Sequence, residues 1–284
     1  MLQSIRGIFT ASLIAGCALA ATPAFAEDGE SDITVSGNAT VASQYRFRGV
    51  GLSNGNVAIQ GGVDVSHSSG IYIGTWGSSL ANTDNSILLD DGTGTIMPYA
   101  VGNYGAVELD VYGGWSGEIT SGLSADIGVI YYLYPDATNR NATFVVDPDP
   151  TVVPTFTGLQ KFPTDYVEFF GSLSTTLGPV EAEWGVAYAP KQKSLGSTDN
   201  FYTYLDLSAG IPSTPVTING HVGYTDGFLT FTNNAKAFDW SVGADLALGE
   251  HISLGVAYVG VEKDGGKIKH VTDDAVVGTL TVSF

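Results

Sequence analysis

Acidic residues recur in pairs at alternate positions of the chain, as Glu108 with Asp110 and Glu181 with Glu183. Because alternate residues of a β-strand face the same side, each pair would present two carboxylates side by side. Such pairs serve as acid and base in glycosidases, but any strand with one acidic face produces them without catalytic meaning. We interpret both pairs as part of a solvated polar wall, with a negatively charged constriction ring as the sharper alternative.

Histidine next to serine is the other pattern that could do chemistry. His67 lies between Ser66 and Ser68, and His221 lies within an alternating apolar segment. A serine activated by a histidine would point to a hydrolase, provided that a carboxylate orients the imidazole. The sequence places no carboxylate to do so, and we predict that the chain is not an enzyme.

The spacing of candidate ligands indicates neither a metal nor a cofactor. The four histidines are scattered. The acidic stretch from 84 to 91 and the pair Asp147 and Asp149 could hold calcium loosely, but neither matches the ligand spacing of an EF-hand loop. The glycine-rich stretch from 49 to 55 precedes no helix, so it does not form a phosphate-binding loop. We predict no metal site and no cofactor.

The first residues have the order of a secretory signal peptide. Arg6 is followed by an apolar run from 8 to 21 and by the small-residue motif Ala24-Phe25-Ala26. We predict cleavage after Ala26, so that residues 1–26 are the signal peptide and residues 27–284 form one folded domain. A lipoprotein signal that makes Cys17 the first residue is the competing interpretation. In either case the folded part has no cysteine and no disulfide.

The charge of the chain excludes some partners. It carries 11 Lys+Arg against 29 Asp+Glu, a net charge of −18. Nucleic acids and anionic lipids are bound by clustered basic residues, so we predict no nucleic-acid partner. No apolar stretch after residue 26 approaches the ~20 residues of a membrane-spanning helix. If the chain crosses a membrane, it does so in strands.

Twelve segments alternate between apolar and polar residues and are predicted to be strands. Every proline after residue 26 lies between them or at their edges, as sheet hydrogen bonding requires. Short and long connections also alternate, which predicts an all-β fold: a single antiparallel transmembrane β-barrel of about twelve strands with both termini on one rim. Pieces at 143–146 or 228–232 would change the strand count to fourteen or ten. The predicted strands are 33–47, 57–66, 71–79, 107–116, 123–134, 166–177, 180–189, 201–211, 216–225, 238–248, 252–261 and 274–284.

Charged residues of these strands lie almost entirely on the non-apolar face. A ring of about twelve strands is too wide for side chains to fill, so this face would line a wet lumen and the apolar face would contact lipid. A soluble sandwich of short strands is the alternative. The predicted pore-lining residues are Arg46, Arg48, Asp64, Glu108, Asp110, Asp126, Glu168, Glu181, Glu183, Asp206, Asp239 and Asp245. Aromatic residues expected on the lipid face near the loop rim are Tyr45, Phe47, Tyr131, Tyr188, Phe201, Tyr224, Phe238, Trp240 and Tyr258.

The end of the chain and its longest loop carry two further predictions. Leu280, Val282 and Phe284 share the apolar face of the last strand, which must pair with the first strand to remove the sheet edges. A terminal aromatic residue after such a pattern resembles the signal read by the outer-membrane insertion machinery. The loop from 135 to 165 is the best candidate to fold into the barrel, with an exposed loop as the alternative.

Four segments resemble those of the TorF-type porin family of exported proteobacterial proteins. They are YRFRG at 45–49, GIYIGTWGSS at 70–79, LDVYGGWSGE at 109–118 and DYVEFFGSLS at 165–174. With the signal peptide and Phe284, the resemblance spans essentially the whole mature chain. It implies an outer-membrane β-barrel with pore activity and names no substrate.

We therefore expect a passive diffusion pore for small solutes in the outer membrane of a Gram-negative bacterium. The ten strand carboxylates against Arg46 and Arg48 predict a preference for cations. The alternatives are an outer-membrane hydrolase of the phospholipase or lipid A deacylase kind, and a plugged structural or adhesive barrel. The expected partners are outer-membrane lipid and the barrel-insertion machinery, and homo-oligomerisation is left open.

Overall fold

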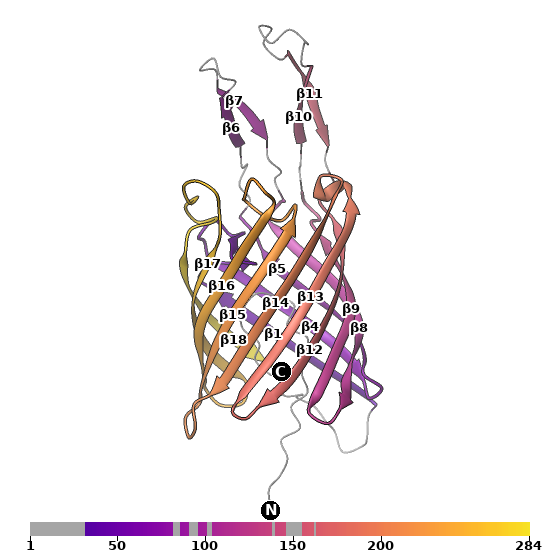
Figure 1. The fold of residues 1–284 in the computed structure, drawn as a ribbon, viewed down its shortest axis with the longest axis vertical. Coiled ribbons are helices and arrows are strands. Elements are labelled where there is room, and N and C mark those ends of the chain that lie inside the picture. Colours follow the sequence, from indigo (N-terminus) through magenta and orange to yellow (C-terminus); the bar gives the residue numbers. More distant parts are fainter. Residues whose placement is uncertain are drawn as a thin grey trace, which may run out of the picture.

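The structure is a computed structural model that describes residues 32–81, 86–90, 96–100, 104–137, 140–145, 155–161 and 163–284. Twelve of its strands close into an antiparallel barrel in the order β1-β18-β17-β16-β15-β14-β13-β12-β9-β8-β5-β4 (Figure 1). The predicted all-β, twelve-stranded barrel is confirmed. The predicted signal peptide lies outside the described residues. No helix in these ranges is both long and apolar enough to span a membrane.

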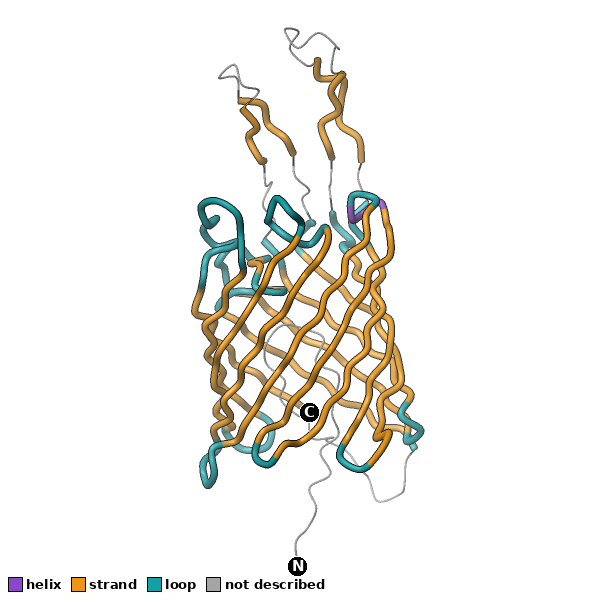
Figure 2. The backbone as a smooth tube through the Cα atoms, viewed as in Figure 1, coloured by secondary structure: helices purple, strands orange, loops and turns teal. Residues whose placement is uncertain are grey.

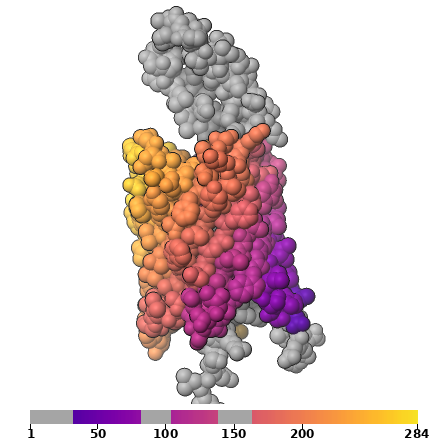
Figure 3. Space-filling view, turned by 45° about the vertical axis from the view of Figure 1, so that its right-hand side comes forward, coloured from indigo at the N-terminus to yellow at the C-terminus, as the bar shows by residue number. Residues whose placement is uncertain are grey.

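The barrel strands have bounds close to those predicted. They are β1 (Ile33–Ala42), β4 (Ala58–His67), β5 (Ile71–Ser79), β8 (Val107–Thr120), β9 (Leu123–Leu133), β12 (Tyr166–Leu177), β13 (Val180–Gln192), β14 (Thr198–Gly210), β15 (Val216–Gly227), β16 (Lys236–Ala247), β17 (Ile252–Val261) and β18 (Ala275–Ser283). Neighbouring strands follow one another in sequence order around the outer wall (Figure 3).

The first and last strands close the barrel. Asn38 pairs with Ser283 and Ala42 with Thr279. At the end of this seam the backbone N–H of Gly37 donates to the carbonyl of Phe284 at 2.8 Å, and the N–H of Phe284 donates back at 2.9 Å. Closure leaves neither terminal strand with an unpaired edge.

The two faces of the wall differ as the alternation of the sequence requires. On β5, Ile71 and Ile73 are 61% and 60% exposed on the outside, whereas Trp76 and Ser78 are buried on the inside. Exposed large apolar side chains follow the same alternation on the other barrel strands. The outer surface is therefore apolar and the inner surface carries most of the polar groups.

The two rims differ in their connections (Figure 2). Tight turns at 68–70, 121–122 and 178–179 join strands at one rim, and Gly122 and Gly178 adopt left-handed φ angles of 78° and 66° there. We call this end the turn rim and the opposite end the loop rim. The loop rim carries the 3-10 helix η1 (Lys193–Leu195) and the connections of 43–57 and 262–274.

Two further hairpins belong to loop-rim connections and take no part in the barrel. They are β6 (Ser86–Asp90) with β7 (Ile96–Ala100), and β10 (Arg140–Val145) with β11 (Thr155–Lys161). The predicted extra piece at 143–146 thus overlaps β10 without adding to the barrel, and 228–232 forms no strand.

The first predicted strand is too long in one direction. It was expected to reach residue 47, but β1 ends at Ala42 and the chain then leaves the wall. Residues 43–57 enter the barrel and form a small hairpin of β2 (Arg46–Phe47) and β3 (Val50–Gly51). The strands of this hairpin alternate as a wall strand does, so the sequence pattern continues past Ala42. We call residues 43–57 the inward segment.

Candidate functional site

A tight turn directs the inward segment. Arg48 and Gly49 join β2 to β3 with φ angles of 48° and 77°, the left-handed pair that a two-residue hairpin of type I′ requires. A Cβ on Gly49 would lie 2.6 Å from the carbonyl oxygen of Gly260 and 2.7 Å from Cβ of Val261. Glycine at this position therefore lets the tip of the hairpin pack directly against β17.

The tip reaches the far side of the barrel through Arg48. Its Nη2 donates to Oε2 of Glu168 on β12 at 2.7 Å, and Tyr132 donates to the same oxygen at 3.2 Å. The guanidinium lies 4.1 Å from the ring centroid of Tyr202. Burial lowers the pKa of Arg48, but Glu168 together with Tyr132 and Tyr202 outweighs this effect, so the net pKa of Arg48 is raised. The ion pair is enclosed, so water screens it little.

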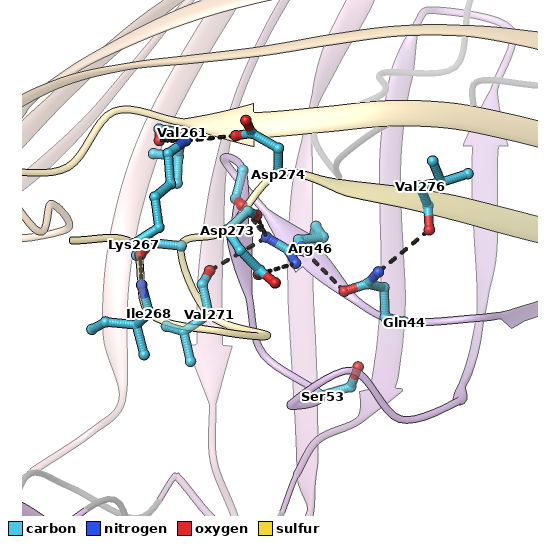
Figure 4. Close-up of polar contacts among 12 residues, drawn as sticks. Gln44, Arg46, Ser53, Val261, Lys267, Ile268, Val271, Asp273, Asp274 and Val276 are labelled. Carbon is cyan, nitrogen blue, oxygen red and sulfur yellow. Dashed lines mark hydrogen bonds and ion pairs between the residues drawn. The ribbon is translucent and has the colours of Figure 1, made fainter.

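The base of the inward segment is anchored by Arg46 (Figure 4). Its Nη2 donates to Oδ1 of Asp273 at 2.9 Å, and its Nη1 donates to the Asp273 carbonyl at 2.6 Å. Nε donates to Oε1 of Gln44 at 3.0 Å, and the Gln44 amide donates to the carbonyl of Val276. Two donor groups of Arg46 thus join the inward segment to the connection of 262–274, and the third donor group orients Gln44 within the segment.

A second ion pair stiffens that connection. Lys267 donates to Oδ1 of Asp274 at 2.5 Å and to the carbonyl of Val261 at 3.1 Å. The bond from Lys267 lowers the pKa of Asp274. Partial burial raises the pKa of Asp273, but a backbone bond from His270 and the bond from Arg46 outweigh it, so the net pKa is lowered. Both carboxylates are held ionised at neutral pH.

Two acids and several aromatic rings surround the inward segment on the β5, β8 and β9 side of the wall. The Tyr45 hydroxyl donates to Oε1 of Glu108 at 3.4 Å, and the ring of Tyr45 lies 5.6 Å from that of Trp76. Asp110 pairs with Trp76 on β5 and with Tyr132 on β9. Glu108 and Asp110 are 1% and 0% exposed.

Toward the turn rim the lumen carries tyrosines bonded to carboxylates. Tyr72 donates to Asp126 and Tyr112 donates to Asp64, each at 2.7 Å. Tyr204 donates to Glu183 at 2.8 Å. These bonds satisfy one carboxylate oxygen each and fix the tyrosine rings along the wall. Nearby glycines make room for them, since a Cβ on Gly74 would meet the ring of Tyr112, and one on Gly185 would meet that of Tyr204.

His221 is enclosed by acceptors. Its Nδ1 lies 2.5 Å from Oδ1 of Asp206, and its Nε2 lies 2.9 Å from Oδ1 of Asp239 and 3.0 Å from the Tyr202 hydroxyl. Carboxylates therefore contact both ring nitrogens, and neither nitrogen contacts a serine among the described residues. His67 contacts Ser69, not Ser66 or Ser68, at 2.9 Å in an exposed turn.

The predicted pore-lining residues fall into three groups. Eight are on strands and face the interior with the contacts or burial given above: Asp64, Glu108, Asp110, Asp126, Glu168, Glu183, Asp206 and Asp239. Asp245 accepts a bond from Asn219 at 2.5 Å, and Glu181 is exposed near the turn rim with Ser208 at 3.4 Å. Arg46 and Arg48 are not on a barrel strand and instead belong to the inward segment.

The inward segment also changes the placement of two aromatic residues. Tyr45 and Phe47 were expected on the lipid face, but Tyr45 is 3% exposed inside the barrel and Phe47 packs against the interior cluster. Tyr131, Tyr188, Phe201, Phe238 and Tyr258 are exposed on the outside as expected. The prediction failed at 45 and 47 because a strand and an inward hairpin show the same short alternation.

Sequence reasoning missed the inward segment as the occupant of the lumen. It favoured the loop from 135 to 165, parts of which lie outside the described residues and whose described strands form the separate β10–β11 sheet. The available signal was the Arg48-Gly49 dipeptide, since glycine after a short alternating run is typical of a two-residue hairpin. Asp273 and Gln44, which hold Arg46, carried no such signal.

Comparison with known proteins adds a family and a fold. A family model described as "Bacterial protein of unknown function (Gcw_chp)" matches residues 26–284. No curated protein matches the sequence. Among solved structures, that of the NanC porin aligns with a TM-score of 0.50 at 9% identity and covers 88% of this chain and 98% of its own. The CymD monoaromatic hydrocarbon channel aligns with a TM-score of 0.43 at 9% identity, over 90% of this chain and 89% of that one. The alignment with the NanC porin at 9% identity shows a shared barrel fold and no more.

Proposed function

Because the chain belongs to the Gcw_chp family of bacterial proteins of unknown function, we propose its activity from the barrel itself: a channel of the Gram-negative outer membrane for passive diffusion of small solutes, with a preference for cations. The family has no activity in its description. The charges inside the barrel, the contacts of the inward segment and the two faces of the wall support a channel.

The imbalance of charge inside the barrel carries the proposal. Two arginines enter the lumen against ten carboxylates of the barrel strands. One of the two, Arg46, is already paired with Asp273 of a loop, and Arg48 is paired with Glu168. A lumen with this excess of negative charge stabilises a passing cation and repels an anion, as rings of acidic side chains do in cation channels.

The outer face supports a location in lipid. Large apolar side chains such as Ile71, Val242 and Val276 are more than half exposed on the outside of the wall. Their burial in hydrocarbon would be favourable by about 25 cal/mol per Å² of apolar surface. Closure of the barrel satisfies the backbone hydrogen bonds between strands, which a bilayer also requires.

The inward segment supports the restriction to small solutes. It enters beside β1, contacts β17 at Gly49 and reaches β12 through Arg48. A solute must pass beside this segment, or the segment must move. The same feature favours a second candidate function, a plugged structural or adhesive barrel in which the segment closes the lumen permanently.

Hydrolysis receives no support from the geometry around the histidines. A general base needs a ring nitrogen free to accept the proton of a nucleophile. Both ring nitrogens of His221 contact carboxylates. Among the described residues, His67 bonds through Nδ1 to the exposed Ser69 and to no carboxylate. We propose no enzymatic activity.

Single-channel recording tests the proposal. The refolded protein in a planar bilayer under a salt gradient should give discrete current steps and a reversal potential of the sign expected for cations. Glu181→Gln combined with Glu183→Gln should reduce that potential, whereas Glu250→Gln, which changes an exposed carboxylate in a turn outside the lumen, should leave it unchanged. A correctly inserted barrel that gives no steps would favour the plugged alternative, and an anion-signed potential would contradict the cation preference.

A further inference from the structure

Glu108 and Asp110 form an unusual pair on the lumen face of β8. They are two positions apart, so their side chains share one face about 7 Å apart, and both are almost completely enclosed. Tyr45 contacts Glu108 at a single oxygen, Oε1. Oε2 of Glu108 and both side-chain oxygens of Asp110 accept no hydrogen bond from the residues that the structure describes.

The number of acceptors without donors distinguishes this pair from the other acids of the lumen. Asp126 and Glu168 each have one buried oxygen without a donor, whereas the pair has three, including both oxygens of Asp110. Asp64, Asp126 and Glu183 each accept a bond from a tyrosine hydroxyl, and Glu168 accepts from Arg48 and Tyr132. Burying an acceptor without a donor costs about 1–3 kcal/mol, and more for a charged group. The two arginines of the inward segment form their ion pairs elsewhere, Arg46 with Asp273 and Arg48 with Glu168.

Aromatic rings enclose the same pair. Trp76 and Tyr132 are the direct neighbours of Asp110 on the two adjacent strands. Tyr45 of the inward segment bonds to Glu108, and its ring lies 5.6 Å from that of Trp76. Carboxylates together with aromatic faces recognise an organic cation through charge and cation–π attraction.

We propose that Glu108 and Asp110, with Trp76, Tyr132 and Tyr45 around them, bind a primary ammonium group. Such a group has three N–H donors in a compact positive charge, which match the three acceptor oxygens of the pair. Tyr45 belongs to the inward segment, whereas the other four residues belong to the wall.

The arrangement favours an amine over other cations. A calcium ion takes six to eight oxygen ligands, and the described residues contain no cluster of three or more acidic, histidine or cysteine ligands suited to a metal. A quaternary ammonium ion has no N–H group and would leave the three oxygens without donors. Primary amines are therefore the solute class that we assign to the proposed channel. The role of the site in permeation rests on the proposed channel function, whereas binding itself does not require an open pore.

Calorimetric titration of the full-length barrel, folded in detergent micelles at constant ionic strength, tests the site. Methylammonium chloride should bind saturably at one site per barrel. Tetramethylammonium chloride, with equal charge but no donor, should bind at least about tenfold more weakly, because charge-assisted hydrogen bonds are lost. Glu108→Gln and Asp110→Asn should each weaken methylammonium binding by about tenfold or more. Glu250→Gln, which changes an exposed carboxylate outside the lumen, serves as the control and should bind as the unchanged protein does.

Three outcomes would overturn the proposal: no saturable methylammonium binding by the unchanged protein, equal binding of tetramethylammonium, or unaltered binding by the Glu108→Gln, Asp110→Asn double variant. The first two comparisons need no variant, so they hold even if a substitution impairs folding. Bilayer recording separates the site from the channel. A barrel that binds methylammonium without conducting would refute the channel alone, and one that conducts without binding would refute the site alone.

Discussion

Arg48 and Glu168 meet across the barrel, with Nη2 of one 2.7 Å from Oε2 of the other. The two residues are 120 positions apart in the chain, one on the inward segment and one on β12. Their side chains are almost fully enclosed. The ion pair therefore links the inward segment to the opposite wall of the barrel.

Removing the arginine should open the lumen and weaken the fold. Arg48→Ala leaves Glu168 buried without its cation, which should cost about 3–5 kcal/mol of unfolding free energy. It should also raise single-channel conductance, because the hairpin loses its distal contact. Arg48→Ala with Glu168→Gln should recover most of the stability and keep the larger conductance. Denaturant unfolding and bilayer recording measure the two effects, and a double variant as unstable as the single one would contradict the pairing.

Gly49→Ala should displace the hairpin without changing any charge. The new Cβ would lie 2.6 Å from the Gly260 carbonyl, and the φ of 77° strains any residue but glycine. We expect larger or noisier conductance with unchanged ion selectivity. Gly122→Ala is the matched control, since its φ of 78° imposes the same backbone strain but its Cβ would meet nothing within 4 Å. Equal effects of the two substitutions would show that strain alone, and not the contact with β17, is responsible.

Low pH should weaken the contact between Arg46 of the inward segment and Asp273. The net pKa of Asp273 is lowered, since bonds from His270 and Arg46 outweigh partial burial. A lowered pKa in the folded state means that the stabilisation is complete above the ordinary value of 3.8 and is lost as pH falls through the lower folded value. Conductance recorded over this range should therefore become noisier. Asp273→Asn should show the noise already at neutral pH and lose the acid transition, and an unchanged transition in this variant would assign it to another group.

Phe284→Ala should impair insertion of the barrel into the outer membrane more than it impairs folding in detergent. The backbone bonds between Phe284 and Gly37 persist in this variant, so refolding in detergent should change little. If the terminal aromatic residue is a signal for the insertion machinery, the amount of folded barrel in the outer membrane of cells should fall several-fold. Heat-dependent gel mobility of membrane fractions measures it, and Leu280→Ala on the same lipid-facing side provides a comparison. Equal losses in cells and in detergent would indicate a structural role only.

The alternation of residues made the wall predictable but not the lumen. Ile71 and Ile73 on one face and Trp76 on the other follow from a period of two, and the barrel follows from many such strands. The same period misled at Tyr45 and Phe47, because a hairpin inside the barrel alternates as a strand in the wall does. The partnership of Arg48 with Glu168 depends on the register of the four intervening barrel strands β4, β5, β8 and β9, which no local pattern contains.

Two tyrosine rings of the lumen lie over glycines of the neighbouring strand. Tyr112 lies over Gly74 and Tyr204 over Gly185, each on an adjacent strand, so that the ring follows the wall and its hydroxyl reaches a carboxylate. A methyl group at either glycine would displace the ring from this position. These glycines therefore leave the space that the rings occupy along the wall. Substituting them one strand at a time should change the free cross-section of the lumen while every aromatic and every charged residue stays in place.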